Sequence, residues 1–536
     1  MAAAAAEQRR AGRRRRRARA CRRARRARAV LRRRAQRRGA APRRDEPARA
    51  RLDRAALRRA HAGDRRAHRR GRRAAAAPAR HRDPNPSRRR AAAPRPLRAG
   101  RGRRRARRHR TRRGPLRRRR RRRVRGRAVS DARFLFVVGE GPDATVIDSQ
   151  VVDTVIAVAR EGVQFDLLFL TNPGPLWRRR DYYATRRREI AARTGGAVRV
   201  LPAPHPLTRA GAAFATGLIA SELLRSRGRL VVHARTDNPA YFASRIARRS
   251  ARLRYVYDAR GAFEGEWRLT AAAAGLSPAA IERGMQRQLA VRHAAVSHAA
   301  HVLCVSSVLR DRLVELHGLD PARASVVPCV ADAAKFGPDE QARDEARRAL
   351  GLEGRFVVVY PGRFGTWHYN EETFAVVRGL MDADPSVFFL VLTPDTEAAA
   401  ALAARTLPEG RFAIRSARHD EVPRYLRAAD LGVLLRAPDP LNEVACPTKF
   451  AEYVMTGLPV LISAGIGDCS PFVEHEQAGA VLAQPDPKEA VAAVARIRNE
   501  PDAARRARIA AVGQRLSRQR YARETAALYR RIAEAP

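Results

Sequence analysis

From Phe134 onward, short runs of apolar and β-branched residues alternate with longer amphipathic stretches rich in Ala and Arg. Continuous apolar strands that alternate with helices are typical of a parallel sheet covered by helices on both faces. The first series therefore predicts a doubly wound α/β domain. Its expected strands are residues 134–138, 165–170, 198–201, 230–233, 255–258, 302–305 and 326–328, and its expected helices are residues 148–162, 210–227, 239–250, 278–300 and 307–317.

The same alternation begins again after a charged stretch, residues 337–348, that shows no strand pattern. A folded part of about 400 residues is too long for one core and fits two domains of ordinary size. We expect two Rossmann-like domains, residues 131–336 and 337–515, that face each other across a cleft, and a C-terminal helix in 516–536 that can cross back to the first domain. The expected strands of the second series are residues 356–360, 387–392, 412–414, 431–435 and 460–462, and its expected helices are residues 371–383, 395–405, 421–429, 448–456 and 487–499.

The first 130 residues differ from the rest in composition. They contain 56 Arg, no Lys and six acidic residues, and so carry +50 of the chain's net charge of +59. The later residues contain 55 basic and 46 acidic residues, a net charge of +9. Leu, Ile, Val and aromatic residues are scarce in the first segment, so it cannot bury enough apolar surface to offset its ordering entropy. We therefore expect residues 1–130 to be disordered, and we do not expect nucleic acid as a partner of the folded part.

Three origins of the Arg-rich segment are open. Arg, Ala, Pro and Gly are the residues of GC-rich codons, and the absence of Lys argues against selection for charge. Both facts favour a translation start assigned too far upstream, with the true start near Val129. The alternatives are a basic arm that binds nucleic acid or anionic lipid, and a targeting peptide.

Neither a spanning helix nor a signal peptide is expected, because no run approaches 18 apolar residues and no apolar segment lies near either candidate start. We therefore expect a cytoplasmic protein. The five cysteines are scattered and show no Cys-x-x-Cys spacing, which argues against a disulfide framework and a zinc site. No Asp-x-Asp pair ends an expected strand, so the sequence implies no metal and no cofactor.

The strongest local signal is Pro447-Thr448-Lys449, followed by Glu452 and Gly457. It predicts a loop, a short helix and a glycine that ends the helix before the next strand. The free N–H groups at such a helix start suit a diphosphate, and Lys449 would add a cation. Glu452 is placed to accept hydrogen bonds from a ribose diol. A solvated Lys449–Glu452 pair would explain the same spacing.

This stretch resembles the donor site of family 4 glycosyltransferases with the GT-B fold, in the subgroup that has Pro-Thr-Lys before a Glu-Tyr pair. The resemblance covers nearly all of residues 131–536, since several separated motifs appear in the family's order. They include Ile147-Asp148-Ser149-Gln150, Tyr257-Asp258-Ala259-Arg260-Gly261, Cys304-Val305-Ser306-Ser307 and Tyr360-Pro361-Gly362-Arg363.

The resemblance implies a retaining enzyme that moves a sugar from a nucleotide-sugar donor to a glycan or lipid-linked acceptor. It also implies that Arg363 contacts the donor diphosphate and that Glu452 contacts the ribose. Two departures stand out. Val444 occupies the place of the family's first glutamate, and the loop 365–369 lacks the family's second cation. We hypothesise that Lys449 supplies this missing positive charge.

On the first-domain side, His233 and Arg235 end a strand where the family commonly places a His or Arg that faces the sugar. We expect a catalytic role for them, with a structural histidine as the alternative. Asp258, Arg260 and Gly261 end the next strand and are expected on the acceptor side. An ion pair between Arg260 and Asp258 is the simpler alternative.

The family's usual setting is the synthesis of surface polysaccharide or glycolipid, so we expect this role here. The runs Arg178–Arg180 and Arg186–Arg188 suggest peripheral contact with an anionic membrane at its inner face, and an ordinary solvated surface is the alternative. Two other functions are carried as alternatives. One is a nucleotide-sugar epimerase of the same fold, and the other is a nucleic-acid-binding protein that acts through the N-terminal Arg arm.

Overall fold

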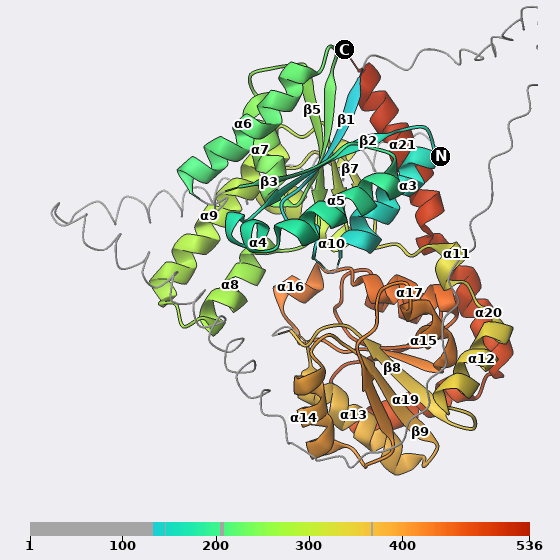
Figure 1. The fold of residues 1–536 in the computed structure, drawn as a ribbon. Helices are drawn as coiled ribbons and strands as arrows, with labels where there is room; N and C mark the ends of the chain where they lie inside the picture. Colours follow the sequence, from blue (N-terminus) through green and yellow to red (C-terminus); the bar gives the residue numbers. More distant parts are fainter. Residues whose placement is uncertain (1–131, 145, 204–207, 366–367, 536) are drawn as a thin grey trace, which may run out of the picture. The chain divides into compact units, whose positions relative to one another are not determined.

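The computed structural model describes residues 132–144, 146–203, 208–365 and 368–535, all within one compact unit (Figure 1). The expectation of disorder for residues 1–130 therefore lies outside the described residues. Within the described part, no helix is long and apolar enough to cross a membrane.

The first sheet is parallel and has seven strands in the order β3-β2-β1-β4-β5-β6-β7. Both faces are buried, because apolar side chains point alternately into two separate core clusters. The α/β, doubly wound prediction is confirmed here. The strands are β1 (Arg133–Val138), β2 (Phe165–Thr171), β3 (Val198–Pro202), β4 (Leu230–Arg235), β5 (Leu253–Ala259), β6 (His301–Cys304) and β7 (Ala324–Val326).

Helices cover both faces of this sheet (Figure 1). Side chains of α6, α7 and α10 join one core cluster, whereas α3 and α5 join the other. The elements are η1 (Asp148–Val152, a π-helix), α3 (Asp153–Arg160), α4 (Pro173–Arg178), α5 (Arg180–Thr194), α6 (Arg209–Arg225), α7 (Asp237–Ala247), α8 (Phe263–Ala273), α9 (Pro278–Ser297), α10 (Ser307–His317), η2 (Pro321–Arg323) and α11 (Ala333–Phe336).

The second sheet is also parallel and has six strands in the order β10-β9-β8-β11-β12-β13. Its two faces are again buried in separate core clusters. The strands are β8 (Phe356–Pro361), β9 (Val387–Leu392), β10 (Phe412–Arg415), β11 (Leu431–Leu434), β12 (Val460–Ser463) and β13 (Gly479–Leu482). The helices are α12 (Glu340–Leu350), α13 (Asn370–Ala383), α14 (Thr396–Thr406), α15 (Val422–Ala428), α16 (Pro440–Glu443), α17 (Thr448–Thr456), α18 (Cys469–His475), α19 (Pro487–Arg498), α20 (Asp502–Gly513) and η3 (Gln514–Leu516).

The last helix, α21 (Arg518–Glu534), packs on α3 and β4 of the first sheet. Its residues Ala522, Ala526 and Tyr529 are buried in the core cluster that also contains Phe134. Arg518 donates a hydrogen bond to the Thr154 hydroxyl at 2.9 Å. The first sheet is therefore completed by residues that follow the second sheet in the chain.

In each sheet the strand order reverses once, between β1 and β4 in the first and between β8 and β11 in the second. Ligands of doubly wound sheets bind in the crevice beyond the carboxyl ends of the strands at such a point. Gly362 follows β8, and Arg436 lies two residues beyond β11. These two positions mark the crevice of the second sheet.

The structure differs from the sequence expectations in several elements. The strand expected at 326–328 was placed wrongly and lies at 324–326, and the helix expected at 148–162 is divided into η1 and α3. α12 forms within the charged stretch that was interpreted as a connection. Its buried face is built partly from Arg343, which binds the Ala429 carbonyl and the Asp430 carboxylate, so the usual apolar period is absent. The elements α4, α5, α8, β13 and α18 were also not expected.

Candidate donor site

Three of the five residues expected to bind the donor, Arg363, Lys449 and Glu452, line one cleft, whereas Pro447 and Thr448 do not line it. Gly362, Arg363, Lys449 and Glu452 line a cavity of about 800 Å³, opposite side chains of η1 and α5. A volume of this size is typical of small-molecule sites, at roughly 300–1,000 Å³. The cleft is therefore large enough for a nucleotide sugar.

Lys449 lies in the first turn of α17, and this helix has the bounds 448–456 expected from the sequence. Its ammonium nitrogen lies 4.0 Å from the centre of the Tyr360 ring. A Cβ atom on Gly362, whose φ is +144°, would come within 2.6 Å of the same nitrogen. Burial and the nearby Arg436 lower the pKa of Lys449 to about 7, although Glu452 opposes the shift. Lys449 forms no ion pair with any described carboxylate.

Glu452 lies one turn further along α17 and is buried. Burial raises the pKa of its carboxyl to about 7, against the attraction of Lys449 and Arg518. A solvated Lys449–Glu452 pair, the simpler interpretation of the spacing, is not what the structure contains. Both groups are instead held in the cleft with weakened charges.

The start of α17 faces the first sheet. Pro447 is the N-cap residue in an extended conformation and provides no side-chain cap, so the first N–H groups of the helix are not capped by it. The Thr448 hydroxyl accepts a hydrogen bond from the Gln150 amide at 2.8 Å. Gly457 ends the helix with a φ of +80°, as expected.

Arg363 lies at the edge of the cleft, and its side chain is 65% exposed. It pairs with Asp395 at 3.3 Å, and the same carboxylate accepts the Phe364 N–H at 3.1 Å. Val444, which replaces the family's first glutamate, is fully buried in the core of the first sheet. The neighbouring Glu443 is exposed, so neither position places a carboxylate in the cleft.

Arg436 was not expected from the sequence. It follows β11 at the reversal point of the second sheet, and burial lowers the pKa of its guanidinium. Its position in the sequence could have revealed it, because Arg436 directly follows the expected apolar strand 431–435. Residues that follow other expected strands were already candidates for the site.

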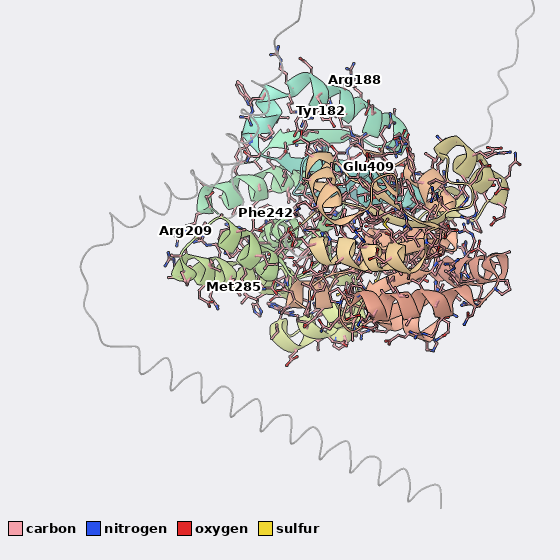
Figure 2. All side chains as sticks on the ribbon, turned by 90° about the horizontal axis from the view of Figure 1, so that it is seen from below. Tyr182, Arg188, Arg209, Phe242, Met285 and Glu409 are labelled. Carbon is pink, nitrogen blue, oxygen red and sulfur yellow. The ribbon has the colours of Figure 1, made fainter. Side chains whose placement is uncertain are left out.

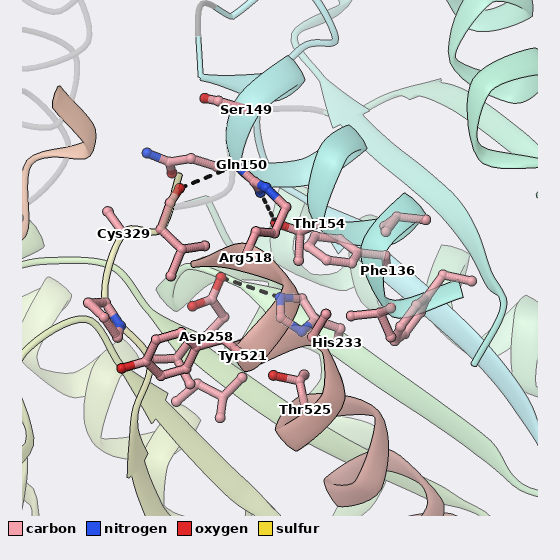
Figure 3. Close-up of a pocket in the computed structure, with 18 of the residues that line it drawn as sticks. Phe136, Ser149, Gln150, Thr154, His233, Asp258, Cys329, Arg518, Tyr521 and Thr525 are labelled. Atoms are coloured by element: carbon pink, nitrogen blue, oxygen red, sulfur yellow. Dashed lines mark hydrogen bonds and ion pairs between the residues drawn. The ribbon is translucent and has the colours of Figure 1, made fainter. Parts of the chain in front are cut away.

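His233 is buried between the first sheet and α21 (Figure 3). Its Nε2 lies 3.3 Å from the Asp258 carboxylate, its Nδ1 contacts the Tyr529 hydroxyl, and its ring stacks on Phe136 at 3.9 Å. These residues line a cavity of about 60 Å³ that is separate from the donor cleft. The catalytic role of His233 stays a prediction.

Arg235 is also buried, and it donates hydrogen bonds to both oxygens of Glu140 at 3.0 and 3.1 Å and to Gln150 at 2.5 Å. The next residue, Thr236, has a φ of +72°, which is rare for a β-branched residue and costs about 1–3 kcal/mol. Strain of this kind clusters at functional sites. It lies here at the reversal point of the first sheet.

Arg260 and Asp258 form the ion pair that was the simpler alternative, at 3.4 Å. Burial opposes the charge of Asp258, but Arg260, His233 and Arg235 together hold the pKa of its carboxyl well below the usual range. Arg260 also donates to Gln150 at 3.0 Å. The Gly261 carbonyl accepts a hydrogen bond from Arg292 at 2.6 Å. No group of three or more potential metal ligands occurs in the described residues.

Two family models match this chain. Residues 147–329 match the glycosyl transferase 4-like domain, and residues 342–514 match the glycosyl transferases group 1. The two matches together cover every strand of both sheets except β1, and most of the chain. This chain belongs to the glycosyltransferase family that is defined by a glycosyl transferase 4-like domain and a glycosyl transferases group 1 domain. The family resemblance of the motifs is thereby confirmed.

Curated relatives match over part of their length. A teichuronic acid biosynthesis glycosyltransferase, TuaC of Bacillus subtilis (strain 168), is 29% identical over 208 residues, which are 38% of this chain and 49% of TuaC. A D-inositol 3-phosphate glycosyltransferase of Thermomonospora curvata is 28% identical over 230 residues, which are 39% of this chain and 50% of the relative. The chain thus spans about half the length of the curated relatives it matches.

Solved structures of the same fold match almost completely. Anabaena Alr3699/HepE, solved in complex with UDP and glucose, is 16% identical with a TM-score of 0.56, over 74% of this chain and 98% of HepE. Sucrose-phosphate synthase from Thermosynechococcus elongatus is 16% identical with a TM-score of 0.56, over 76% of this chain and 100% of the synthase. At these identities the likeness shows the fold alone, and the expected GT-B fold is confirmed.

Proposed function

We propose that this member of the glycosyltransferase family is a retaining enzyme that transfers a sugar from a nucleotide-sugar donor to a glycan or lipid-linked acceptor. The observation that carries the proposal is the position of Lys449. A half-buried cation that forms no ion pair with a described carboxylate lies against the backbone of Gly362 at the reversal point of the second sheet. An unpaired buried charge is costly, and a bound anion would offset that cost.

The chemistry of the reaction fits this arrangement. When the bond to the sugar breaks, negative charge develops on the diphosphate leaving group. Lys449 and the N–H groups at the start of α17 are held in fixed positions to stabilise that charge, with Arg363 at the rim. In the proposed mechanism, closure of the cleft excludes water and limits hydrolysis of the donor. Glu452 binds the ribose hydroxyls.

The acceptor is proposed to enter from the first-sheet side. Asp258, Arg260 and Gly261 belong to this side in the proposal, and Arg235 is proposed to face the sugar. The support is positional, because Arg235 and Arg260 both bind the Gln150 carbonyl oxygen, and Gln150 in turn contacts α17. These side chains therefore connect the proposed acceptor side to the donor cleft.

A role in surface polysaccharide or glycolipid synthesis, at the inner face of a membrane, is part of the proposal. The support is a surface of α4 and α5 where Trp177 is 80% exposed and exposed arginines are frequent. Tyr182 and Arg188 lie on the same helix α5 (Figure 2). An aromatic side chain surrounded by arginines suits an anionic lipid surface. Sedimentation with phosphatidylglycerol vesicles tests this, and equal recovery of the full chain with phosphatidylcholine vesicles would contradict it.

The proposed function is tested in two steps with the full chain. First, a panel of UDP-, GDP- and ADP-sugars is screened by thermal shift, because a ligand that binds the folded state raises the melting temperature. The stabilising donor is then incubated with glycan and lipid-linked acceptors, and products are identified by mass spectrometry and the anomeric configuration by NMR. Transfer with retention supports the proposal. Conversion of the donor sugar without any acceptor would instead indicate an epimerase.

A further inference from the structure

Arg436 lies just beyond the end of β11, beside the strand end that carries Gly362 of the proposed diphosphate site. It follows β11, and Gly362 follows β8, the neighbouring strand on the other side of the reversal point. The backbone N–H of Arg436 donates to the Ser463 hydroxyl at 3.0 Å, which anchors the residue to β12. The position of Arg436 at the strand end is therefore fixed by the sheet itself.

The guanidinium of Arg436 lacks a counter-charge. Its Nη1 donates a hydrogen bond to the Asn442 amide oxygen at 3.2 Å, and this acceptor is neutral. Its buried Nε has no partner among the described residues, and no described carboxylate forms an ion pair with it. By contrast, the buried Arg292 pairs with both Asp237 and Glu264. Arg436 is half-buried, and its buried Nε atom and unpaired charge are unfavourable unless an anion is supplied from outside.

Arg436 is part of a positive cluster. It helps to lower the pKa of Lys449, after burial, and burial together with Arg436 and Lys449 lowers the pKa of His368 to about 2. The geometry agrees with these shifts, because Lys449 lies against Gly362 at the end of β8 and Arg436 follows the adjacent strand β11. Two cations at neighbouring strand ends match the two charged groups of a diphosphate.

We propose that Arg436 is the second cation that binds the donor diphosphate, alongside Lys449. In this proposal Lys449 and Arg436 together provide the positive charge that the loop 365–369 lacks in sequence. The inference rests on the proposed function, because it assigns a residue to the donor site. The alternative is a purely structural role, in which Arg436 serves only to hold Asn442 through their hydrogen bond.

The test uses inorganic pyrophosphate as the probe, so it requires neither the nucleotide base nor the sugar. Binding to the full chain is measured by isothermal titration calorimetry at fixed ionic strength for wild type, Arg436→Met and Arg405→Met. Arg405 is the matched control, because it lies on α14 with an exposed side chain that pairs with Glu371. We expect Arg436→Met to weaken pyrophosphate binding by about 10- to 100-fold, as for loss of a charged hydrogen bond, and Arg405→Met to leave it unchanged.

Melting temperature separates binding from structure. Because Arg436 is a half-buried charge without a carboxylate partner among the described residues, Arg436→Met is expected to melt at the wild-type temperature or above it while binding less pyrophosphate. Unchanged pyrophosphate affinity in this variant overturns the inference. If Arg436→Met does not fold, Arg436→Gln is used instead, because glutamine keeps a hydrogen-bond donor for Asn442. Unchanged pyrophosphate affinity of that variant also overturns the inference.

The same measurements distinguish this inference from the proposed function. A chain that binds pyrophosphate through Arg436 but transfers no sugar refutes the function and leaves the inference standing. A chain that transfers sugar while Arg436→Met keeps wild-type pyrophosphate affinity refutes the inference and leaves the function standing.

Discussion

Donor binding should weaken as pH rises through neutrality, because the cation that receives the diphosphate titrates there. The pKa of Lys449 is lowered to about 7 in the free protein. A bound diphosphate favours the ammonium form, so the proton must be present or be taken up on binding. With a pKa near 7, the charged fraction falls about tenfold between pH 6 and pH 8, and the apparent affinity falls by the same factor.

Other groups in the cleft define the necessary controls. Glu452 has a pKa of about 7 and gains negative charge over the same range, so the experiment is repeated with Glu452→Gln. His368 stays neutral because its pKa is about 2, and Tyr360 stays neutral because its pKa is raised to about 12. The assay therefore has to distinguish the titration of Lys449 from that of Glu452.

The assay is calorimetric titration of the donor nucleotide sugar from pH 6 to pH 8.5. A nucleotide sugar is preferred to the free nucleoside diphosphate, whose terminal phosphate itself titrates at a pKa of about 6. Lys449→Met should bind more weakly and lose the pH dependence that Glu452→Gln retains. Wild-type affinity that is flat across this range, or an unchanged slope in Lys449→Met, would refute the reasoning.

The same shift has a consequence for stability with a definite sign. The folded pKa of Lys449 lies below its ordinary value of 10.5, so the folded state binds fewer protons than the unfolded state between those two values. The destabilisation of the folded state by the charged Lys449 is complete below pH 7, and it is relieved as pH rises from 7 toward 10.5. Lys449→Met should therefore stabilise the chain more at pH 6 than at pH 9, as measured by urea unfolding.

Three further substitutions test other contacts. Gly362→Ala should lower donor affinity and cost about 1–3 kcal/mol, because φ is +144° and the new Cβ would meet the Lys449 nitrogen at 2.6 Å; calorimetry and urea unfolding measure the two effects. Arg292→Met leaves the fully buried Asp237 without its guanidinium and should cost about 3–5 kcal/mol in urea unfolding, with equal stability arguing against the ion pair. Gln150→Ala removes the 2.8 Å hydrogen bond to the start of α17 and should cost about 1 kcal/mol, and an unchanged unfolding midpoint would count against that contact.

The sequence was sufficient for the fold and for the place of the donor cleft. Apolar runs identified twelve of the thirteen strands, because strands buried on both faces are continuous in the sequence. The strand that was missed, β13, is four residues long and begins with Gly479. The start and end of α17 were predicted correctly, since Pro447 and Gly457 have clear conformational preferences.

Helices whose buried face contains charged groups were harder to predict. α5 buries Tyr183, Ile190 and Thr194 among many arginines, so its apolar period is faint. Arg436 was missed for a related reason, because a single arginine in a sequence does not show whether a carboxylate will lie beside it. That depends on neighbours such as Asn442 and Lys449, which the fold brings together from other elements.

The packing of α21 on the first sheet affects the order of events during synthesis. Residues of β1 and β2 emerge from the ribosome well before Ala526 and Tyr529, which cover them. Contacts of such large sequence separation form late, so a nascent chain that still lacks α21 exposes an apolar face of the first domain. Maturation of the first domain is thus coupled to translation through the end of α21. A product that stops before this helix would expose that face and be a substrate for proteolysis.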